Sequence, residues 1–408
     1  MFNHNAYSPD LPGGTRHFDL ARQLVKRGHM VTIFATSFHH HLHKETRLQP
    51  GEDWKIEEVD GVFFVWIHTP PYQRNDWRRV WNMVAFMIKA SRLGKKLPDL
   101  KPEIGSPDVV IGSSPDLLTP LAAFHVARRF HVPFVMEVRD LWPQTIIDMG
   151  VLSSKNPITK TLQVLEKFLY QRAELIISLL PRAHEYIAAC GVSPKKIVWV
   201  PNGVDLSRFE SATQDTSNNE RFRVMYLGAH GQANALDVLI QAAKIVQDRG
   251  LEEIGFILMG DGPEKPRLIE SSKKLGLINL EFCNPVPKSE VANVLRNADA
   301  LLFNLEEVTV FKYGISPNKL FDFMADGKPI ISSVNAPDNP VDEASSGLIV
   351  RPRDPDALAK AIINIYEMSP EEREKMGRRG REYVAEYHDI SRLALTLEQT
   401  LTQIIADK

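Results

Sequence analysis

Residues 313–333, YGISPNKLFDFMADGKPIISS, combine a polar turn, an amphipathic run and an apolar strand. Ser316 and Pro317 are of the types found at a helix N-cap and at the first helical residue, so a helix is predicted to start there. Free amides at a helix start bind anions, and Lys319 in the first turn would add a positive charge. The carboxylate of Asp322, one turn on, can accept hydrogen bonds from hydroxyl groups. The pattern favours a phosphate site beside a ribose site; the alternative is an ordinary helix cap with an exposed aspartate.

Two further loops with glycine follow apolar strands, YLGAHG around Gly228 and His230, and MGDGP around Gly260 and Gly262. Glycine lets the backbone approach a ligand closely, although glycine after a strand is also typical of an ordinary turn. Neither loop has the dinucleotide spacing GxGxxG, and GxxxxGK[ST] does not occur. The motifs therefore count against a dehydrogenase and against a P-loop NTPase.

The elements that must position these residues form an alternating pattern of buried-looking strands and helices. Such alternation is typical of an α/β protein with a parallel sheet covered on both faces. Before the first glycine loop only residues 1–4 are available for a strand, and residues 205–223 are polar enough to predict an interdomain linker. The predicted strands are 31–35, 62–67, 109–111, 134–138, 175–178 and 197–200, then 224–227, 256–259, 280–283, 300–304, 329–332 and 348–350.

Length and composition narrow the class of protein. A chain of 408 residues suits two domains, and a net charge of -2 argues against a nucleic-acid partner. Cys190 and Cys283 are the only cysteines, which gives no disulfide framework or zinc pattern. The sequence has no long apolar run and no charged-then-apolar leader, so we expect a cytoplasmic protein.

With these motifs in place, the chain resembles the GT-B glycosyltransferases of family 4 (group 1), which are retaining nucleotide-sugar enzymes. The resemblance covers nearly the whole chain. It rests on GGTRHFDLARQLVKRGH, on VPNGVDLSRF at 200–209, on MGDGPE at 259–264 and on KLFDFMADGKPII at 319–331. The segments EVRDLWP and GISPNKLFD are similar to bacterial O-antigen and capsule enzymes of the N-acetylfucosaminyl-transferase type.

The resemblance implies two Rossmann-like, doubly wound parallel-sheet domains facing a central cleft. It places an acceptor-binding domain at 1–200, a nucleotide-sugar-binding domain at 201–386 and a C-terminal helix at 387–408 that packs back on the first domain. The implied reaction moves a sugar, such as an N-acetyl-deoxyhexose, from a UDP-linked donor to a lipid-linked saccharide. Rival interpretations are a nucleotide-sugar epimerase or hydrolase on the same fold, and a non-catalytic nucleotide-sugar-binding subunit.

Asp322 matches the second acid of the family's E-x7-E motif, which holds the ribose hydroxyls, whereas Gly314 stands where the first Glu is usual. The Arg and Lys that usually hold the diphosphate are missing and are replaced near Ala229, His230 and Asn234. Lys319 is the first candidate to replace them, ahead of Arg139 and Lys312. The remaining donor-binding residues that we assign from the motif are Ile315, Ser316, Pro317 and Asn318.

In the N-terminal half, Arg139 stands where many relatives carry a His beside the donor sugar. Arg139 cannot act as a base, so we expect it to stabilise charge, with Asp140 accepting from a sugar hydroxyl or orienting Arg139. The alternative is an Arg-Asp pair that fixes the loop. We expect Gly13 and Gly14 to let their loop approach the donor phosphates or the acceptor.

For the mechanism we favour retention by front-face attack, in which the departing diphosphate takes the acceptor proton. Arg139, Asp140 and Lys319 are the candidate catalytic residues. The sequence offers no pair of carboxylates suited to double displacement. It also has no DxD motif at a strand end, so we expect no essential metal and no cofactor other than the donor substrate.

Two basic or histidine-rich stretches remain. The segment 72–101 carries eight Arg and Lys residues, and Trp77, Trp81, Val84 and Ile88 share one helical face. A basic helix with tryptophans favours peripheral docking on an anionic membrane, here the inner face of the cell membrane; the alternative is a helix packed on its own domain with solvated cations. The histidines at 39, 40, 41 and 43 lack acidic or cysteine partners and predict a solvated loop.

Overall fold

The computed structural model describes residues 1–40, 42–74, 76–210 and 221–407. Contacts divide the chain into two compact units: unit 1 is Met1–Ser8, Gly14–Pro201 and Ile390–Lys408, and unit 2 is Pro9–Gly13 and Asn202–Asp389. The functional domain assignments made from the sequence stay predictions. Most of the linker predicted at 205–223 lies outside the described residues, but residues 205–210 pack within unit 2, where Phe209 is fully buried.

Unit 1 contains one mixed sheet and a small two-stranded sheet. Its strands are β1 (Thr32–Thr36), β2 (Phe38–His39), β3 (Lys44–Glu45), β4 (Trp54–Val59), β5 (Val62–Ile67), β6 (Val110–Ser113), β7 (Phe134–Val138), β8 (Leu175–Ser178) and β9 (Ile197–Trp199). Its helices are α1 (Arg16–Lys26), α2 (Trp77–Leu100), η1 (Pro102–Ile104), α3 (Leu118–Phe130), α4 (Gln144–Asp148), α5 (Pro157–Arg172), α6 (Ala183–Ala189), η2 (Pro194–Lys196) and α15 (Ile390–Ala406).

In unit 1 a single residue, Phe2, stands where a first strand would be expected. Phe2 bridges in parallel to Phe34 of β1 and to Gly112 of β6, which joins β1-β5-β4 to β6-β7-β8-β9. The strand pairs in this sheet are parallel, except for the pair that β4 forms with β5. The antiparallel β4 was not predicted; it pairs with β5 through the tight turn at Asp60 and Gly61, both of which have positive φ.

Unit 2 is a six-stranded, fully parallel sheet. Its strands are β10 (Phe222–Leu227), β11 (Ile254–Met259), β12 (Leu280–Cys283), β13 (Ala300–Asn304), β14 (Ile330–Ser333) and β15 (Gly347–Ile349). Its helices are α7 (Ser207–Glu210), η3 (Gln232–Asn234), α8 (Leu236–Asp248), α9 (Lys265–Lys274), η4 (Lys288–Glu290), α10 (Val291–Leu295), η5 (Thr309–Tyr313), α11 (Asn318–Asp326), α12 (Pro340–Glu343), α13 (Pro355–Glu367) and α14 (Pro370–Tyr387).

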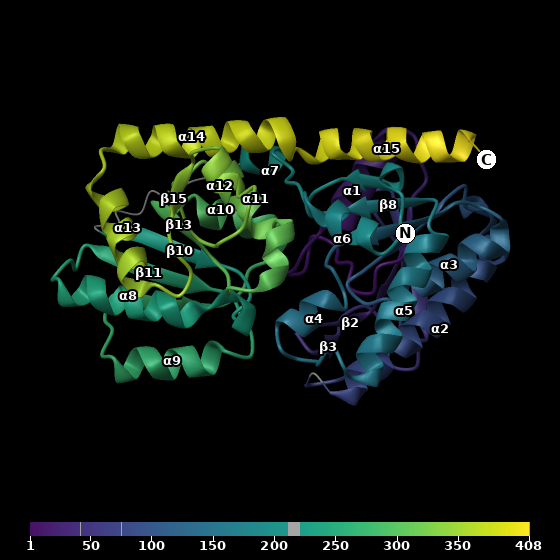
Figure 1. The fold of residues 1–408 in the computed structure, drawn as a ribbon, viewed down its shortest axis with the longest axis horizontal. Coiled ribbons are helices and arrows are strands. Elements are labelled where there is room, and N and C mark those ends of the chain that lie inside the picture. Colours follow the sequence, from purple (N-terminus) through teal and green to yellow (C-terminus); the bar gives the residue numbers. More distant parts are fainter. Residues whose placement is uncertain (41, 75, 211–220, 408) are drawn as a thin grey trace. The chain divides into compact units, whose positions relative to one another are not determined.

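The strand order in unit 2 is β12-β11-β10-β13-β14-β15, the doubly wound order in which the chain changes direction across the sheet between β10 and β13. Ligands of such sheets bind outside the carboxyl ends of the strands at this point. The predicted α/β class with parallel sheets in two units is thus confirmed (Figure 1).

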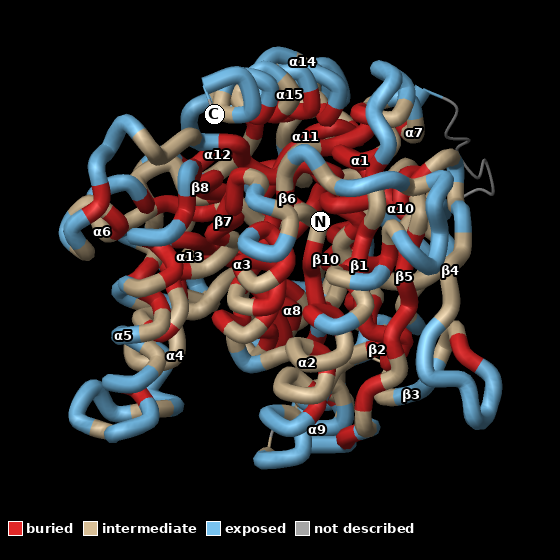
Figure 2. The backbone as a smooth tube through the Cα atoms, turned by 90° about the vertical axis from the view of Figure 1, so that its right-hand side faces the viewer, coloured by how far each residue is buried: buried red, intermediate tan, exposed pale blue. Residues whose placement is uncertain are grey.

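Apolar side chains on both faces of each sheet form the cores. In unit 2, α8 and α13 cover one face through Leu239 and Ile362, and α11 covers the other through Phe321 and Phe323. In unit 1, α15 packs on α1 through Leu397. Figure 2 shows the strands largely buried and the outer surfaces of the helices exposed. No described helix is long and apolar enough to cross a bilayer.

Candidate functional site in unit 2

The loops predicted to bind a ligand leave the same edge of the unit 2 sheet. Gly228 and His230 follow β10, Gly260 and Gly262 follow β11, and the 314–318 turn leads from β13 into α11. Because all these strands are parallel, their carboxyl ends meet at one edge, where β10 and β13 are neighbours and the chain changes direction across the sheet; sheets of this order bind ligands at this point. The structure therefore brings the predicted donor-binding residues of unit 2 together.

The start of α11 differs from the prediction by one residue. The helix begins at Asn318, Pro317 is the N-cap, and no side chain caps the helix. Ser316 was predicted as the cap, but its Oγ accepts a hydrogen bond from the backbone N–H of Asn202 at 2.9 Å. The Asn202 side chain also donates through Nδ2 to the Ser316 carbonyl oxygen. The hydroxyl is therefore committed to a neighbouring segment instead of the helix.

Lys319 places its amine at this edge of the sheet, beside the loop that follows β10. Its Nζ donates to Tyr226 Oη at 2.9 Å and to Asn234 Oδ1 at 2.6 Å, and it lies 4.5 Å from the centre of the Tyr226 ring. Among the described residues no carboxylate pairs with this amine. Burial lowers the pKa of Lys319 to about 7. An amine that lacks a counter-ion here is suited to an anionic ligand.

Asp322 is buried, with only 5% of its surface exposed, and its Oδ2 is bonded to Nζ of Lys288. Lys288 lies in η4, in the loop that follows β12, and the sequence analysis missed it. The prediction of an exposed aspartate, offered as the alternative, is wrong. Lys288 follows a strand that ends at the same sheet edge, so the sequence could have indicated that it lies near the site. Its pairing with Asp322 could be found only from the folded structure.

Gly260 and Gly262 let two loops of the chain pack together, which differs from the predicted approach to a ligand. A Cβ atom at 260 would lie 1.8 Å from the carbonyl oxygen of Gly228, and one at 262 would lie 2.5 Å from that of His230. At Gly228 a Cβ atom would lie 3.1 Å from Cδ of Lys319. These glycines therefore hold the β10 and β11 loops and the Lys319 amine in one compact arrangement.

His230 is fully buried, and neither of its ring nitrogens has a hydrogen-bond partner among the described residues. Burial lowers its pKa to about 4, with the charge of Lys265 contributing, so the ring is neutral at pH 7. Its backbone is fixed by hydrogen bonds to Asp261 and Glu264. Donation of a hydrogen bond by His230 to the donor, from the neutral ring, stays a prediction.

Three further residues, Gly314, Ile315 and Lys312, lie in or next to this turn. Gly314 has φ +91°, a conformation that favours glycine, so the turn itself requires this residue. Ile315 was predicted to touch the donor, but its side chain is buried in the core with Phe321. Lys312 is exposed and lies over the Tyr313 ring at 4.9 Å.

In unit 1, Arg139 and Asp140 follow β7 but do not pair with each other. Asp140 accepts a hydrogen bond from Thr145 Oγ1 at 2.6 Å, and burial raises its pKa. Nε of Arg139 is buried without a hydrogen-bond partner among the described residues. No hydrogen bond or ion pair joins the two side chains in the described part of the chain, which counts against the alternative of an Arg-Asp pair that fixes the loop, although their charges attract each other. Orientation of Arg139 by Asp140 stays a prediction.

Comparison with known proteins identifies the family. Residues 13–203 match the model of the glycosyl transferase 4-like domain, and residues 221–368 match the model of glycosyl transferases group 1. The chain belongs to the group 1 glycosyltransferases. This confirms the resemblance proposed from the sequence motifs, and the two matches together span most of both units.

Similar proteins support the same family. WbjE of Pseudomonas aeruginosa, named as a probable glycosyltransferase, is 27% identical over 64% of this chain and 66% of its own length. WcaI of Escherichia coli K12, whose name assigns it to colanic acid biosynthesis as a glycosyl transferase, is 23% identical over 81% of this chain and 82% of its own. The Anabaena protein HepE, crystallised with UDP-glucose, is 12% identical with a TM-score of 0.67 over 98% of each chain and shares the fold.

A buried network that sequence reasoning missed lies at the carboxyl ends of β6 and β7 in unit 1 of this group 1 glycosyltransferase. Arg16 Nε donates to Glu137 Oε1 at 2.9 Å, and His17 Nε2 lies 2.6 Å from Glu137 Oε2. Ser113 Oγ also donates to Glu137. The signal was present, because Arg16 and His17 follow the first glycine loop and Glu137 precedes Arg139.

The loop at Gly13 and Gly14 precedes α1, and Gly13 has φ +142°. Gly13 is counted with unit 2 and Gly14 with unit 1. The contact of this loop with a donor or acceptor stays a prediction.

The histidine stretch of the glycosyltransferase is not a solvated loop. His39 is buried in β2, and His40 Nδ1 lies 2.5 Å from Tyr72 Oη. His43 Nδ1 lies 3.2 Å from the Tyr72 carbonyl oxygen, and His41 lies outside the described residues. The described residues contain no group of three metal-ligating side chains.

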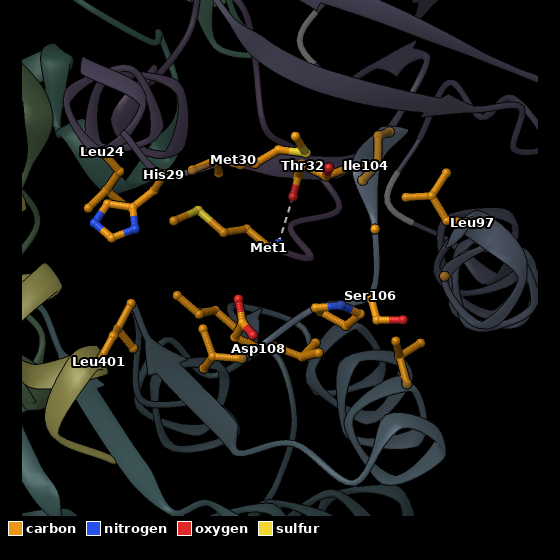
Figure 3. A pocket seen from close by; sticks show the side chains of 18 of the residues that line it. Met1, Leu24, His29, Met30, Thr32, Leu97, Ile104, Ser106, Asp108 and Leu401 are labelled. Atoms are coloured by element: carbon orange, nitrogen blue, oxygen red, sulfur yellow. Dashed lines mark hydrogen bonds between the residues drawn. The ribbon is translucent and has the colours of Figure 1, made fainter. Parts of the chain in front are cut away.

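The described residues of each unit line a cavity of similar size. One of about 250 Å³ in unit 1 lies at the amino ends of β1 and β6, near Met1, Asp108 and Leu401 (Figure 3). It is at the sheet edge opposite the carboxyl-end loops. The other, of about 300 Å³ in unit 2, is lined by Gly231, Glu264 and Arg267 and adjoins the loops after β10 and β11.

Proposed function

We propose that this glycosyltransferase transfers a sugar from a UDP-linked donor to a lipid-linked saccharide, with retention of configuration. The observation that carries the proposal is the Lys319 amine, which has no carboxylate partner among the described residues and lies at the start of α11, one turn from Asp322. HepE binds UDP-glucose on the same fold, and the name of WcaI connects that relative with a surface polysaccharide.

Lys319 and the first turn of α11 bind the diphosphate in this proposal, and Asp322 binds the ribose. A helix terminus contributes about 0.3 to 1 kcal/mol, whereas micromolar binding needs about 8 kcal/mol. Charge-assisted hydrogen bonds of about 1.5 to 3 kcal/mol each must therefore supply much of the affinity. Lys319 is the cation that unit 2 provides for the donor.

In the chemical step, the acceptor hydroxyl attacks the anomeric carbon from the face that the diphosphate leaves. The C–O bond to the diphosphate breaks as the new glycosidic bond forms, and a diphosphate oxygen takes the hydroxyl proton. Lys319 stabilises the charge that develops on the leaving group. No metal is required by this scheme.

A transfer assay tests the proposal directly. Purified protein is screened by thermal shift against nucleotide sugars, because a ligand that binds only the folded state raises the unfolding temperature. The stabilising donor is then incubated with membrane extract of lipid-linked saccharides and the anomeric configuration of the product is determined by NMR. Transfer with retention supports the proposal, whereas donor hydrolysis alone, or tight UDP binding without transfer, contradicts it.

Lys319→Met is expected to weaken UDP binding at least tenfold and to leave uridine binding nearly unchanged, because only UDP carries phosphates. A bound diphosphate favours the protonated amine and so raises the pKa of Lys319 from about 7. UDP binding should therefore take up a proton at pH 8, and affinity should fall as the pH rises above about 7. Calorimetry in two buffers of different ionisation enthalpy measures this uptake. If Lys319→Met lost affinity for UDP and for uridine equally, Lys319 would lie away from the phosphates.

We also propose that α2 docks on the membrane, where the lipid-linked acceptor is found. Trp77 is 69% exposed and Trp81 is 52% exposed in the first two turns, with Val80 beside them, whereas Val84 and Ile88 are partly buried. The exposed apolar face is therefore limited to the amino end of the helix, where Arg78 adds charge.

Neutralising Arg78, Arg79, Lys95 and Lys96 by glutamine is expected to reduce flotation with anionic vesicles at least tenfold. Each basic residue near such a surface contributes about 1 kcal/mol. The matched control neutralises four exposed cations of unit 2, namely Arg249, Lys273, Lys274 and Lys360. Flotation unchanged by the α2 substitutions, or reduced equally by both sets, would contradict docking through α2.

A further inference from the structure

The chain passes from unit 1 to unit 2 between Pro201 and Asn202 and returns between Asp389 and Ile390, apart from the loop Pro9–Gly13, which is counted with unit 2. Within unit 2 these two connecting segments lie side by side. The backbone N–H of Val204 donates to the carbonyl oxygen of His388 at 2.9 Å, and Val204 forms a parallel bridge with Asp389.

Both segments are also bonded to the turn that starts α11. Asn202 donates its backbone N–H to Ser316 Oγ at 2.9 Å and its Nδ2 to the Ser316 carbonyl oxygen. The carbonyl oxygen of Asn202 accepts from Nδ1 of His388 at 2.9 Å. A carbonyl oxygen cannot donate, so the His388 ring carries its proton on Nδ1.

The His388 ring is fixed from its other side as well. It stacks on Phe321 of α11 with ring centres 4.0 Å apart, and only 2% of the residue is exposed. Burial lowers the pKa of His388 to about 4, so the ring is neutral near pH 7 and keeps the Nδ1–H that Asn202 needs. Asn202, His388, Ser316 and Phe321 thus form one connected set, which we call the brace.

We propose that Asn202 and His388 are positioning residues for the donor: through Ser316 and Phe321 they hold the first turn of α11 in its nucleotide-binding conformation and couple it to both connecting segments. This inference rests on the proposed UDP-binding role of that turn. Ser316 is not free to cap the helix, so the orientation of the turn is set by its partner at Asn202. UDP binding at the turn should therefore make the two connecting segments more ordered. Ordering of those segments should in return strengthen UDP binding, because such coupling acts in both directions.

Asn202→Ala tests the brace, because it removes the Nδ2 donor and leaves the backbone bond to Ser316. The matched control is Gln247→Ala, which removes a side-chain amide that also ties two segments, donating to Gly276 and accepting from the N–H of Ile278. Gln247 lies in the last turn of α8, at the amino-end edge of the sheet. Both variants should unfold a few degrees below wild type, but only Asn202→Ala should raise the Kd for UDP, by tenfold or more.

Two further variants separate positioning from simple stability. His388→Phe keeps a ring against Phe321 and loses Nδ1–H, so its loss of UDP affinity should be smaller than that of Asn202→Ala. Ser316→Ala removes the Oγ atom that accepts the hydrogen bond from the backbone N–H of Asn202. In wild type, UDP should slow hydrogen exchange of the Asn202 and Val204 amides at least fivefold; in Ser316→Ala this slowing should be lost at Asn202.

The outcomes are distinct. Asn202→Ala with a Kd within twofold of wild type, or exchange at Asn202 and Val204 that UDP does not change, would overturn the brace and leave the proposed donor site standing. A Kd increase in Gln247→Ala as large as that in Asn202→Ala would show a general stability effect and would also overturn it. Wild-type protein that binds no UDP would refute the donor proposal and the brace together.

Discussion

Asp322→Ala is expected to cost the protein about 3 to 5 kcal/mol of unfolding free energy and to weaken UDP binding ten- to a hundredfold. The first effect follows because the Lys288 cation, only 11% exposed, is left buried without its carboxylate. The second follows because the ribose hydroxyls lose an acceptor worth roughly 1 to 3 kcal/mol. Thermal unfolding measures the first loss and calorimetric titration with UDP measures the second.

The double variant Asp322→Ala, Lys288→Met separates these effects. It removes both charges, so it should recover most of the lost stability without recovering affinity, because an unpaired buried charge is what destabilises the single variant. Binding of 2′-deoxy-UDP and 3′-deoxy-UDP to wild type identifies which hydroxyl Asp322 accepts from. UDP affinity restored in the double variant, or unchanged in the single variant, would refute the ribose role.

Gly260→Ala is expected to destabilise unit 2 by about 3 kcal/mol or more and to abolish measurable UDP binding. Its Cβ would lie 1.8 Å from the Gly228 carbonyl oxygen, so the loops after β10 and β11 must separate, and the residue must also keep φ near +146°. Separation would move Gly228 away from the Lys319 amine. Chemical denaturation and UDP titration measure the two effects.

Gly250→Ala is the control for Gly260→Ala. Gly250 also has a positive φ, +72°, but a Cβ there has no atom within 4 Å. This variant carries backbone strain alone, which costs about 1 to 2 kcal/mol, and should bind UDP normally. If both variants lost equal stability and both bound UDP, the contact between the two loops would not be what requires glycine at 260.

The strands were predictable because buried parallel strands are short apolar runs bounded by turn residues. For example, the predicted bounds of Phe134–Val138 and Ala300–Asn304 match the structure. The starts of α13 and α14 also follow from local sequence, because the side chains of Asp354 and Ser369 cap nearby backbone amides. The antiparallel β4 was missed although Asp60 and Gly61 form the dipeptide typical of a tight hairpin.

Parts of the candidate site depended on long-range contacts that no local pattern contains. Ser316 was predicted as a cap from its neighbours alone, but a partner 114 positions away takes its hydroxyl. Lys288 pairs with Asp322 across 34 positions, and Lys319 reaches Asn234 across 85. The sequence indicated which residue types gather at the sheet edge, whereas their pairings follow from the strand order.

The Lys319 amine, which is bonded only to the neutral groups of Tyr226 and Asn234 in the described part of the chain, also affects how binding should be measured. A positive group with no carboxylate partner among the described residues, held beside backbone amides, can take up small oxyanions such as inorganic phosphate or sulfate in place of a nucleotide. Such ions would compete with UDP, so titrations in phosphate buffer should give weaker apparent affinity than titrations in zwitterionic buffers of the same ionic strength.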